Sequence, residues 1–164
     1  MSINLPIIYY NIQYMVDNRN IKKIVSILKR LYSEAKCGLI FKNPLQLTVA
    51  TILSAQCTDE RVNIVTKDLF KKYKTAEDYA QADPAELERY IKSAGLYKNK
   101  TKNIIGCCQK IAADFNGKIP QTMAELISLP GIGRKTANVV LGNGFGLAEG
   151  IAVDTHVNRV SRRL

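Results

Sequence analysis

The sequence predicts an all-α protein of short helices joined by tight turns. Three observations predict this class. The first two are that apolar residues recur at helical spacing along most of the chain and that helix-capping patterns follow one another closely. The third is that no segment of four or more residues alternates apolar and polar side chains as a strand would. Apolar residues make up 46% of the 164 residues, which is typical of a packed globular protein and excludes disorder as the main state.

Three helical patterns occupy the first half of the chain. An apolar stripe runs through residues 21–31, with lysines on the other faces. Residues 45–55, which follow Pro44, are nearly all apolar, as expected for a buried central helix. The third pattern covers residues 62–70 and ends in a basic run at 71–74.

Capping signals indicate further helix starts. An N-cap residue is followed three positions later by an acid in three places: Thr75 with Asp78, Asp83 with Glu86, and Thr122 with Glu125. The first and third of these resemble capping boxes. Another apolar pattern, over residues 104–115, ends at Asn116-Gly117, a helix stop or turn.

The charge of the chain favours a polyanionic partner. Lysine and arginine number 24 against 14 acidic residues, a formal net charge of +10. Nucleic acid is the commonest partner of so basic a protein, although charge alone leaves a merely soluble, basic protein as an alternative. No apolar run reaches the ~18 residues that a membrane span needs, and the N-terminal residues lack the basic region of a signal peptide. We therefore expect no membrane partner.

The cysteines do not form a metal-binding pattern. Cys107 and Cys108 are adjacent, so they suit neither an ordinary disulfide nor a two-ligand zinc clip. Cys37 and Cys57 stand apart, and His156 is the single histidine. We expect reduced, mostly buried thiols, as in a cytosolic protein, and no metal site.

The most specific stretch is residues 129–140, a Pro-Gly-x-Gly turn that enters a helix directly. The glycines let the turn backbone approach another molecule, and the free amides that open the helix make a phosphate site. A corner that only packs is the alternative, but the flanking residues of the turn favour phosphate binding. The candidate contacts are Pro130, Gly131, Ile132, Gly133, Arg134 and Thr136.

Two residues in this region have reactive side chains. Lys135 lies in the first turn of the helix, where the positive helix end and Arg134 disfavour its charged form, as an amine nucleophile requires. The alternative is a solvated surface lysine. Asp154 follows nineteen residues later and is an N-cap candidate, which leaves its carboxylate ionised. The glycines between them let the chain turn back, so Asp154 is expected to face Lys135 across a cleft.

Four spaced segments carry a family resemblance. They are Leu-Ser-Ala-Gln-Cys-Thr-Asp at 53–59, Gly-Leu-Tyr-Lys-Asn-Lys at 95–100, the turn and helix at 129–140, and Val-Asp-Thr-His at 153–156. From about Cys37 onward the chain resembles the endonuclease III family of the helix–hairpin–helix DNA glycosylase superfamily.

The resemblance implies a two-lobed all-α fold with DNA in the groove between the lobes. Residues 37–150 would form a helical-bundle (six-helix barrel) domain, with the helix–hairpin–helix at about 122–142. Residues 19–36 and 151–164 would belong to a second, cluster-side lobe that is incomplete here, and residues 1–18 form a poorly defined appendage. We expect a monomer.

The resemblance also implies residue roles in base excision repair. Lys135 would be the nucleophile and Asp154 the essential carboxylate of a bifunctional N-glycosylase. Such an enzyme removes oxidised pyrimidines and cleaves the abasic site on its 3′ side by β-elimination, through a Schiff base. Gln56 and Leu96 would fill the gap left by the extruded nucleotide, although a helix-surface amide and core packing are the alternatives. His156 would contact DNA.

The sequence departs from the family in one respect. Members normally continue for dozens of residues and carry four cysteines that hold a [4Fe-4S] cluster. None of the four cysteines here has that spacing, so we expect no cofactor in this chain. A non-catalytic helix–hairpin–helix DNA-binding module and an inactive truncated remnant stay open as alternatives. The expected partner is double-stranded DNA with damaged pyrimidines or abasic sites, in the cytoplasm at the nucleoid if the source is bacterial.

Overall fold

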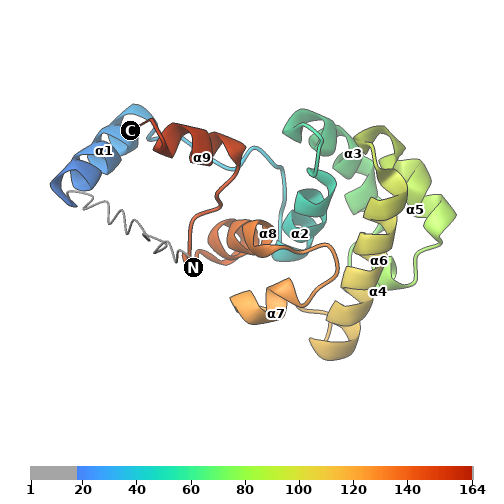
Figure 1. Cartoon of the computed structure of the whole chain (residues 1–164). Coiled ribbons are helices and arrows are strands. Elements are labelled where there is room, and N and C mark those ends of the chain that lie inside the picture. The colour runs from blue at the N-terminus through green and yellow to red at the C-terminus, as the bar shows by residue number, and fades with distance from the viewer. Residues whose placement is uncertain (1–17, 164) are drawn as a thin grey trace, which may run out of the picture. The chain divides into compact units, whose positions relative to one another are not determined.

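The structure is a computed structural model that describes residues 18–163, and every regular element within that range is helical. This confirms the all-α prediction. All of the predicted appendage except residue 18 lies outside the described residues. The elements, drawn in Figure 1, are α1 (Asn18–Leu31), α2 (Pro44–Leu53), α3 (Asp59–Lys72), α4 (Ala76–Ala80), α5 (Pro84–Ile91), the 3₁₀ turn η1 (Lys92–Ala94), α6 (Tyr97–Asp114), α7 (Met123–Ile127), α8 (Arg134–Val139), the π-helical turn η2 (Val140–Phe145) and α9 (Thr155–Ser161).

The chain divides into two compact units, Met1–Lys36 and Cys37–Leu164. In the described part of the first unit, α1 is the regular element, and its apolar stripe is exposed. The side chains of Ile21, Val25 and Leu28 are 42% to 44% exposed. None of the described helices is long and apolar enough to cross a membrane.

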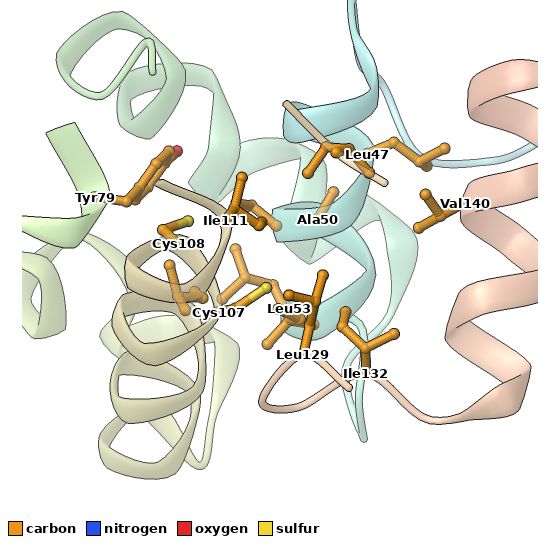
Figure 2. Packing of buried hydrophobic residues seen from close by; sticks show 14 of the residues in the cluster. Leu47, Ala50, Leu53, Tyr79, Cys107, Cys108, Ile111, Leu129, Ile132 and Val140 are labelled. Atoms are coloured by element: carbon orange, nitrogen blue, oxygen red, sulfur yellow. The ribbon is translucent and has the colours of Figure 1, made fainter. Parts of the chain in front are cut away.

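Helix α2 forms the centre of the second unit. Asn43 caps it by accepting a hydrogen bond from the amide of Gln46, and Pro44 occupies the first turn, where no amide donor is required. Leu47 and Leu53 are fully buried, and α2 packs against α3, α6, α8 and η2. Figure 2 shows side chains of α2 and α6 and residues of the turn after α7 directed into one apolar cluster.

Helix α6 is the longest described helix, and it begins earlier than its apolar pattern predicts. The pattern begins at residue 104, whereas the helix begins at Tyr97. Its first two turns contain Lys100 and Asn103, whose packing a hydrophobic pattern does not reveal. Helices α4 and α5 pack on α6 and complete this side of the unit.

The predicted caps are present, with one difference. Thr75 and Asp78 form a full capping box, and Asp83 accepts hydrogen bonds from two amides of α5. Thr122 accepts a hydrogen bond from the amide of Glu125, but the Glu125 carboxylate accepts from the Thr122 hydroxyl at 2.6 Å. The prediction of a capping box at Thr122 was therefore wrong for one of its two hydrogen bonds. The Glu125 carboxylate accepts from the Thr122 hydroxyl instead of from the Thr122 backbone amide.

The short helix α7 leads into the turn that precedes α8. Leu129 and Ile132, on either side of the Pro130-Gly131 pair, are buried and anchor the turn in the core. Helix α8 then continues as the π-helical η2 and ends at Gly146, which has φ +71°. The sequence did not predict the π turn, because apolar spacing does not separate π from α geometry over six residues.

Candidate active site

The turn between α7 and α8 is fixed against α6. The Ile132 amide donates to the Leu129 carbonyl at 3.1 Å, which closes the turn. Gly131 has φ +77°, and a Cβ added to it would lie 2.8 Å from the Cβ of Asn103. Only glycine therefore suits position 131, both for its backbone conformation and for its approach to α6. The side chain of Ile132, one of the predicted DNA contacts, is only 5% exposed, and it packs in the core.

The start of α8 is open to solvent. Gly133 is its N-cap residue and makes no side-chain capping bond, and a Cβ at Gly133 would meet no atom within 4 Å. Arg134 and Lys135 follow in the first turn and are exposed. The first-turn amides and the positive helix end thus lie at the surface together with two cationic side chains, an arrangement that suits a phosphate group.

Asp154 is the N-cap residue of α9. Its carboxylate accepts a hydrogen bond from the Val157 amide at 2.8 Å. This bond is the largest of the causes that hold the pKa of Asp154 below its usual 3.8. Desolvation raises the pKa by less than the bond lowers it, and the Lys135 charge adds a still smaller lowering. The carboxylate is therefore ionised at neutral pH, and Lys135 is close enough to act on it.

Asn138 links α8 to the segment that leads to Asp154. Its side-chain amide donates to the Ile151 carbonyl at 3.1 Å. Gly150 lies against the same side chain, since a Cβ there would be 3.2 Å from the Asn138 Oδ1 atom. Asn138 follows Lys135 by three residues and so projects from the same face of the helix. In Figure 1 the chain turns back after η2 before α9 begins.

The predicted catalytic residues, Lys135 and Asp154, both line the same two cavities. One has a volume of about 450 Å³ and the other about 740 Å³. Both are lined by Gln56, Lys135 and Asp154, so they adjoin one another. Thr136 also lines the first cavity and His156 the second.

The other predicted site residues lie outside these two cavities. Leu96 is 54% exposed and precedes α6, and Pro130 lines a different cavity on α6. Arg134, Gly131 and Gly133 line neither of the two cavities. The structure thus separates a central group around Lys135 from the exposed Leu96 turn and the hairpin turn.

A comparison of the sequence with protein families identifies the family of this chain. Residues 49–164 match the family described as HhH-GPD superfamily base excision DNA repair protein. This chain belongs to the HhH-GPD superfamily. The match includes the cavity residues Gln56, Lys135 and Asp154 as well as the hairpin.

Curated relatives place the chain close to endonuclease III within the HhH-GPD superfamily. It is 56% identical to Endonuclease III of Synechocystis sp. over 142 residues, which cover 87% of this chain and 65% of that protein. It is 51% identical to Endonuclease III of Bacillus subtilis over 148 residues, with 88% and 67% covered. The chain therefore spans about two thirds of the length of these relatives.

Solved structures agree with the HhH-GPD assignment. A non-covalent endonuclease III–DNA complex matches with a TM-score of 0.85 and 47% identity, covering 91% of this chain and 69% of that one. A trapped endonuclease III–DNA covalent intermediate, described as an estranged-adenine complex, matches with a TM-score of 0.86 and the same identity, covering 92% and 70%.

The cysteines of this HhH-GPD chain do not fit an iron–sulfur cluster. Cluster ligands are thiolates. Cys107 and Cys108 are adjacent and buried, so they lack the spacing of cluster ligands, and burial raises the pKa of the Cys107 thiol to about 12. Burial likewise raises the pKa of the neighbouring Cys108 thiol. Among the residues that the structure describes, no group of three or more histidine, cysteine or acidic side chains is arranged to hold a metal ion.

Sequence reasoning did not single out Asn138 or Lys100. Its spacing from Lys135 could have identified Asn138, because residues three apart in a helix lie on the same face. No sequence pattern could have identified Lys100. A lysine in a polar helical turn is normally exposed, whereas Lys100 is 3% exposed.

Proposed function

We propose that this chain acts in base excision repair as a DNA N-glycosylase that removes oxidised pyrimidines and then cleaves the strand at the abasic site. The observation that carries the proposal is the shared cavity of Lys135 and Asp154, which combines an amine with an ionised carboxylate. The similarity to endonuclease III supports the choice of reaction. Double-stranded DNA that contains the lesion is the proposed partner.

Access to the lesion requires extrusion of the nucleotide. A base inside the stack is out of reach of the cavity, so the damaged nucleotide must rotate out of the duplex. The cavity of about 450 Å³ lies in the range of small-molecule pockets, which suits a nucleoside. Gln56 on the cavity wall and the exposed Leu96 are proposed to occupy the space that the nucleotide leaves.

Base removal depends first on Asp154. As the bond between C1′ and the base breaks, its electrons leave with the base, and positive charge develops on the sugar. An ionised carboxylate beside that sugar stabilises the charge. The Lys135 amine then forms a bond to C1′. The departing base acquires a proton and leaves the cavity.

Strand cleavage follows from the covalent intermediate. The nitrogen of Lys135 loses a proton, and the C1′–O4′ bond breaks with its electrons going to O4′, which takes up a proton. The opened sugar is then joined to Lys135 by a Schiff base at C1′. The iminium group withdraws electrons and makes the C2′ proton more acidic, so a general base can remove it. The electron pair forms the C2′–C3′ double bond, and the 3′ phosphate leaves with the electrons of its C–O bond. Water then hydrolyses the imine and restores the amine.

Borohydride trapping tests this function. The protein is incubated with duplex DNA that contains thymine glycol or an abasic site, and borohydride reduces any Schiff base to a stable amine. We expect a covalent adduct that is lost in Lys135→Ala. Lys110→Ala is the matched control, because it removes the charge of a lysine on α6 that lies outside both site cavities.

The other outcomes identify the alternatives. No adduct with retained, salt-sensitive DNA binding would contradict the enzyme assignment and leave a binding module. No DNA binding at low salt would indicate an inactive protein. An adduct that persists in Lys135→Ala would refute the assignment of the nucleophile.

A further inference from the structure

Lys100 is a buried lysine that joins two distant segments of the chain. Its side chain is 3% exposed, although it belongs to the polar first turns of α6. Its ammonium donates to the Leu53 carbonyl at 2.7 Å and to the Ala94 carbonyl at 2.8 Å. Leu53 is 47 residues away in the sequence.

Both carbonyls belong to helix ends. Leu53 is the last residue of α2, and Ala94 is the last residue of η1. Terminal carbonyls lack partners within their own helix, and they carry the negative end of the helix dipole, so a cation is a favourable partner. Burial lowers the pKa of Lys100, because a buried ammonium loses solvation by water.

The two helix ends lead directly to Gln56 and Leu96. Gln56 follows Leu53 by three residues and has φ +53°. Leu96 follows Ala94 by two residues and has φ +48°. Residues other than glycine are rarely found in this left-handed region, so the surrounding structure must hold both backbones in place.

A single ammonium therefore braces two strained turns. An apolar residue at position 100 would leave the Leu53 and Ala94 carbonyls without this buried donor. Each turn would then lose the contact that fixes it relative to the other. The hairpin turn at residues 130–133 is closed by the Ile132–Leu129 hydrogen bond and lies close to Asn103, and neither contact involves Lys100, so we expect the turn to be unaffected.

We propose that Lys100 is a positioning residue that holds the Gln56 and Leu96 turns at a fixed separation, so that both side chains enter the duplex together when the nucleotide is extruded. This proposal rests on the proposed function. It concerns the extrusion step and not the chemistry at Lys135. Its effect should therefore depend on whether the substrate is stacked in a duplex.

The test compares abasic-site cleavage in duplex and in single-stranded DNA. Extrusion costs least in a single strand. In single-turnover assays, Lys100→Met should slow cleavage in the duplex about tenfold or more, while cleavage in the single strand changes less than about threefold. Lys110→Met, which removes the same charge from the same helix, should leave the ratio of the two rates unchanged. Equal slowing on both substrates, or none, would overturn the proposal.

A double-variant cycle distinguishes positioning from a general loss of stability. In a Leu96→Ala background, Lys100→Met should slow duplex cleavage much less than in the wild type, because the turn it positions no longer carries the leucine. Additive effects would overturn the proposal. If Lys100→Met does not fold, Lys100→Gln removes the charge and shortens the side chain by one bond, and an unchanged ratio of rates in that variant would count against the proposal equally.

Hydrogen exchange tests the brace without any activity. Exchange of amides in residues 54–58 and 92–97 should accelerate in the Lys100 variant, while the Ile132 amide keeps its protection. Unchanged exchange in both segments would overturn the proposal. A wild-type protein that cleaves neither substrate would instead contradict the proposed function, and the exchange result would still decide the role of Lys100.

Discussion

Asp154 combines a structural role with an electrostatic one at the scale of a single residue. As the N-cap of α9 it accepts a hydrogen bond from the Val157 amide, and as an anion it lies within the electrostatic reach of Lys135. The hydrogen bond and the charge depend on different properties of the side chain. Substitution can therefore separate them.

Asp154→Asn should preserve the helix and abolish most of the base excision. Asparagine caps a helix about as well as aspartate but has no charge to stabilise the developing cation on the sugar. We expect thermal unfolding within a few degrees of the wild type and a fall in single-turnover excision of about a hundredfold or more. Asp154→Ala serves as the control that loses both properties. Wild-type excision in Asp154→Asn would show that the charge is not required.

The titration of Asp154 should report its distance from Lys135. The folded-state pKa lies below 3.8, so the carboxylate adds stability above that pH and loses it as the pH falls through the lowered value. In Lys135→Ala the pKa should rise toward 3.8 but stay below it, because the Val157 hydrogen bond is the larger cause. Carbon-detected NMR of the carboxyl group measures the shift. An unchanged pKa in Lys135→Ala would mean that the two groups are apart in solution.

At the scale of the element, the two glycines of the hairpin turn have different functions. Gly131 has a positive φ and touches α6, whereas Gly133 has φ −94° and faces open space. The first glycine is required for packing inside the protein. The second leaves the turn backbone accessible from outside, where we propose that a phosphate approaches.

Substitution by alanine should distinguish these functions. Gly131→Ala should destabilise the fold by about 2 kcal/mol, because it combines an unfavourable backbone conformation with a close contact to Asn103. Gly133→Ala should cost only about 0.5 kcal/mol, since alanine is a poorer N-cap than glycine, but it should weaken DNA binding. Urea unfolding and fluorescence anisotropy measure the two effects. Equal destabilisation by both substitutions would contradict this division.

At the scale of the whole molecule, the net charge of +10 should govern DNA affinity. Each neutralised phosphate releases counterions, so the logarithm of the binding constant falls linearly with the logarithm of the salt concentration. If about six phosphates are contacted, affinity for undamaged duplex should fall about a thousandfold between roughly 50 and 200 mM salt. Anisotropy titrations measure the slope. A flat dependence would show that the basic charge does not face the DNA.

Much of the fold was predictable because it depends on local chemistry. Apolar spacing located α2 and α3, and the Thr75–Asp78 capping box marked the start of α4 correctly. The early start of α6 and the π turn after α8 were not predictable from apolar spacing. The first turns of α6 lack an apolar pattern, and six residues do not separate π from α geometry.

The sequence named the main residues of the candidate site, and its geometry was only partly predictable. Lys135, Asp154 and Gln56 were identified in advance, and the structure assembles them around adjoining cavities. Asn138 was missed because its hydrogen bond to Ile151 exists only after the chain turns back. Lys100 was missed for the same reason, as its two acceptors lie at the ends of other elements.

The sequence by itself determined the helical class, the hairpin turn and the reactive side chains. These depend on properties that residues carry with them: backbone freedom, capping capacity, charge and nucleophilicity. The tertiary structure alone decided which cavities Lys135 and Asp154 share, that Asn138 bonds to Ile151, and that Lys100 is buried between two helix ends. Those outcomes depend on contacts between segments far apart in the chain, which form only when the core is packed.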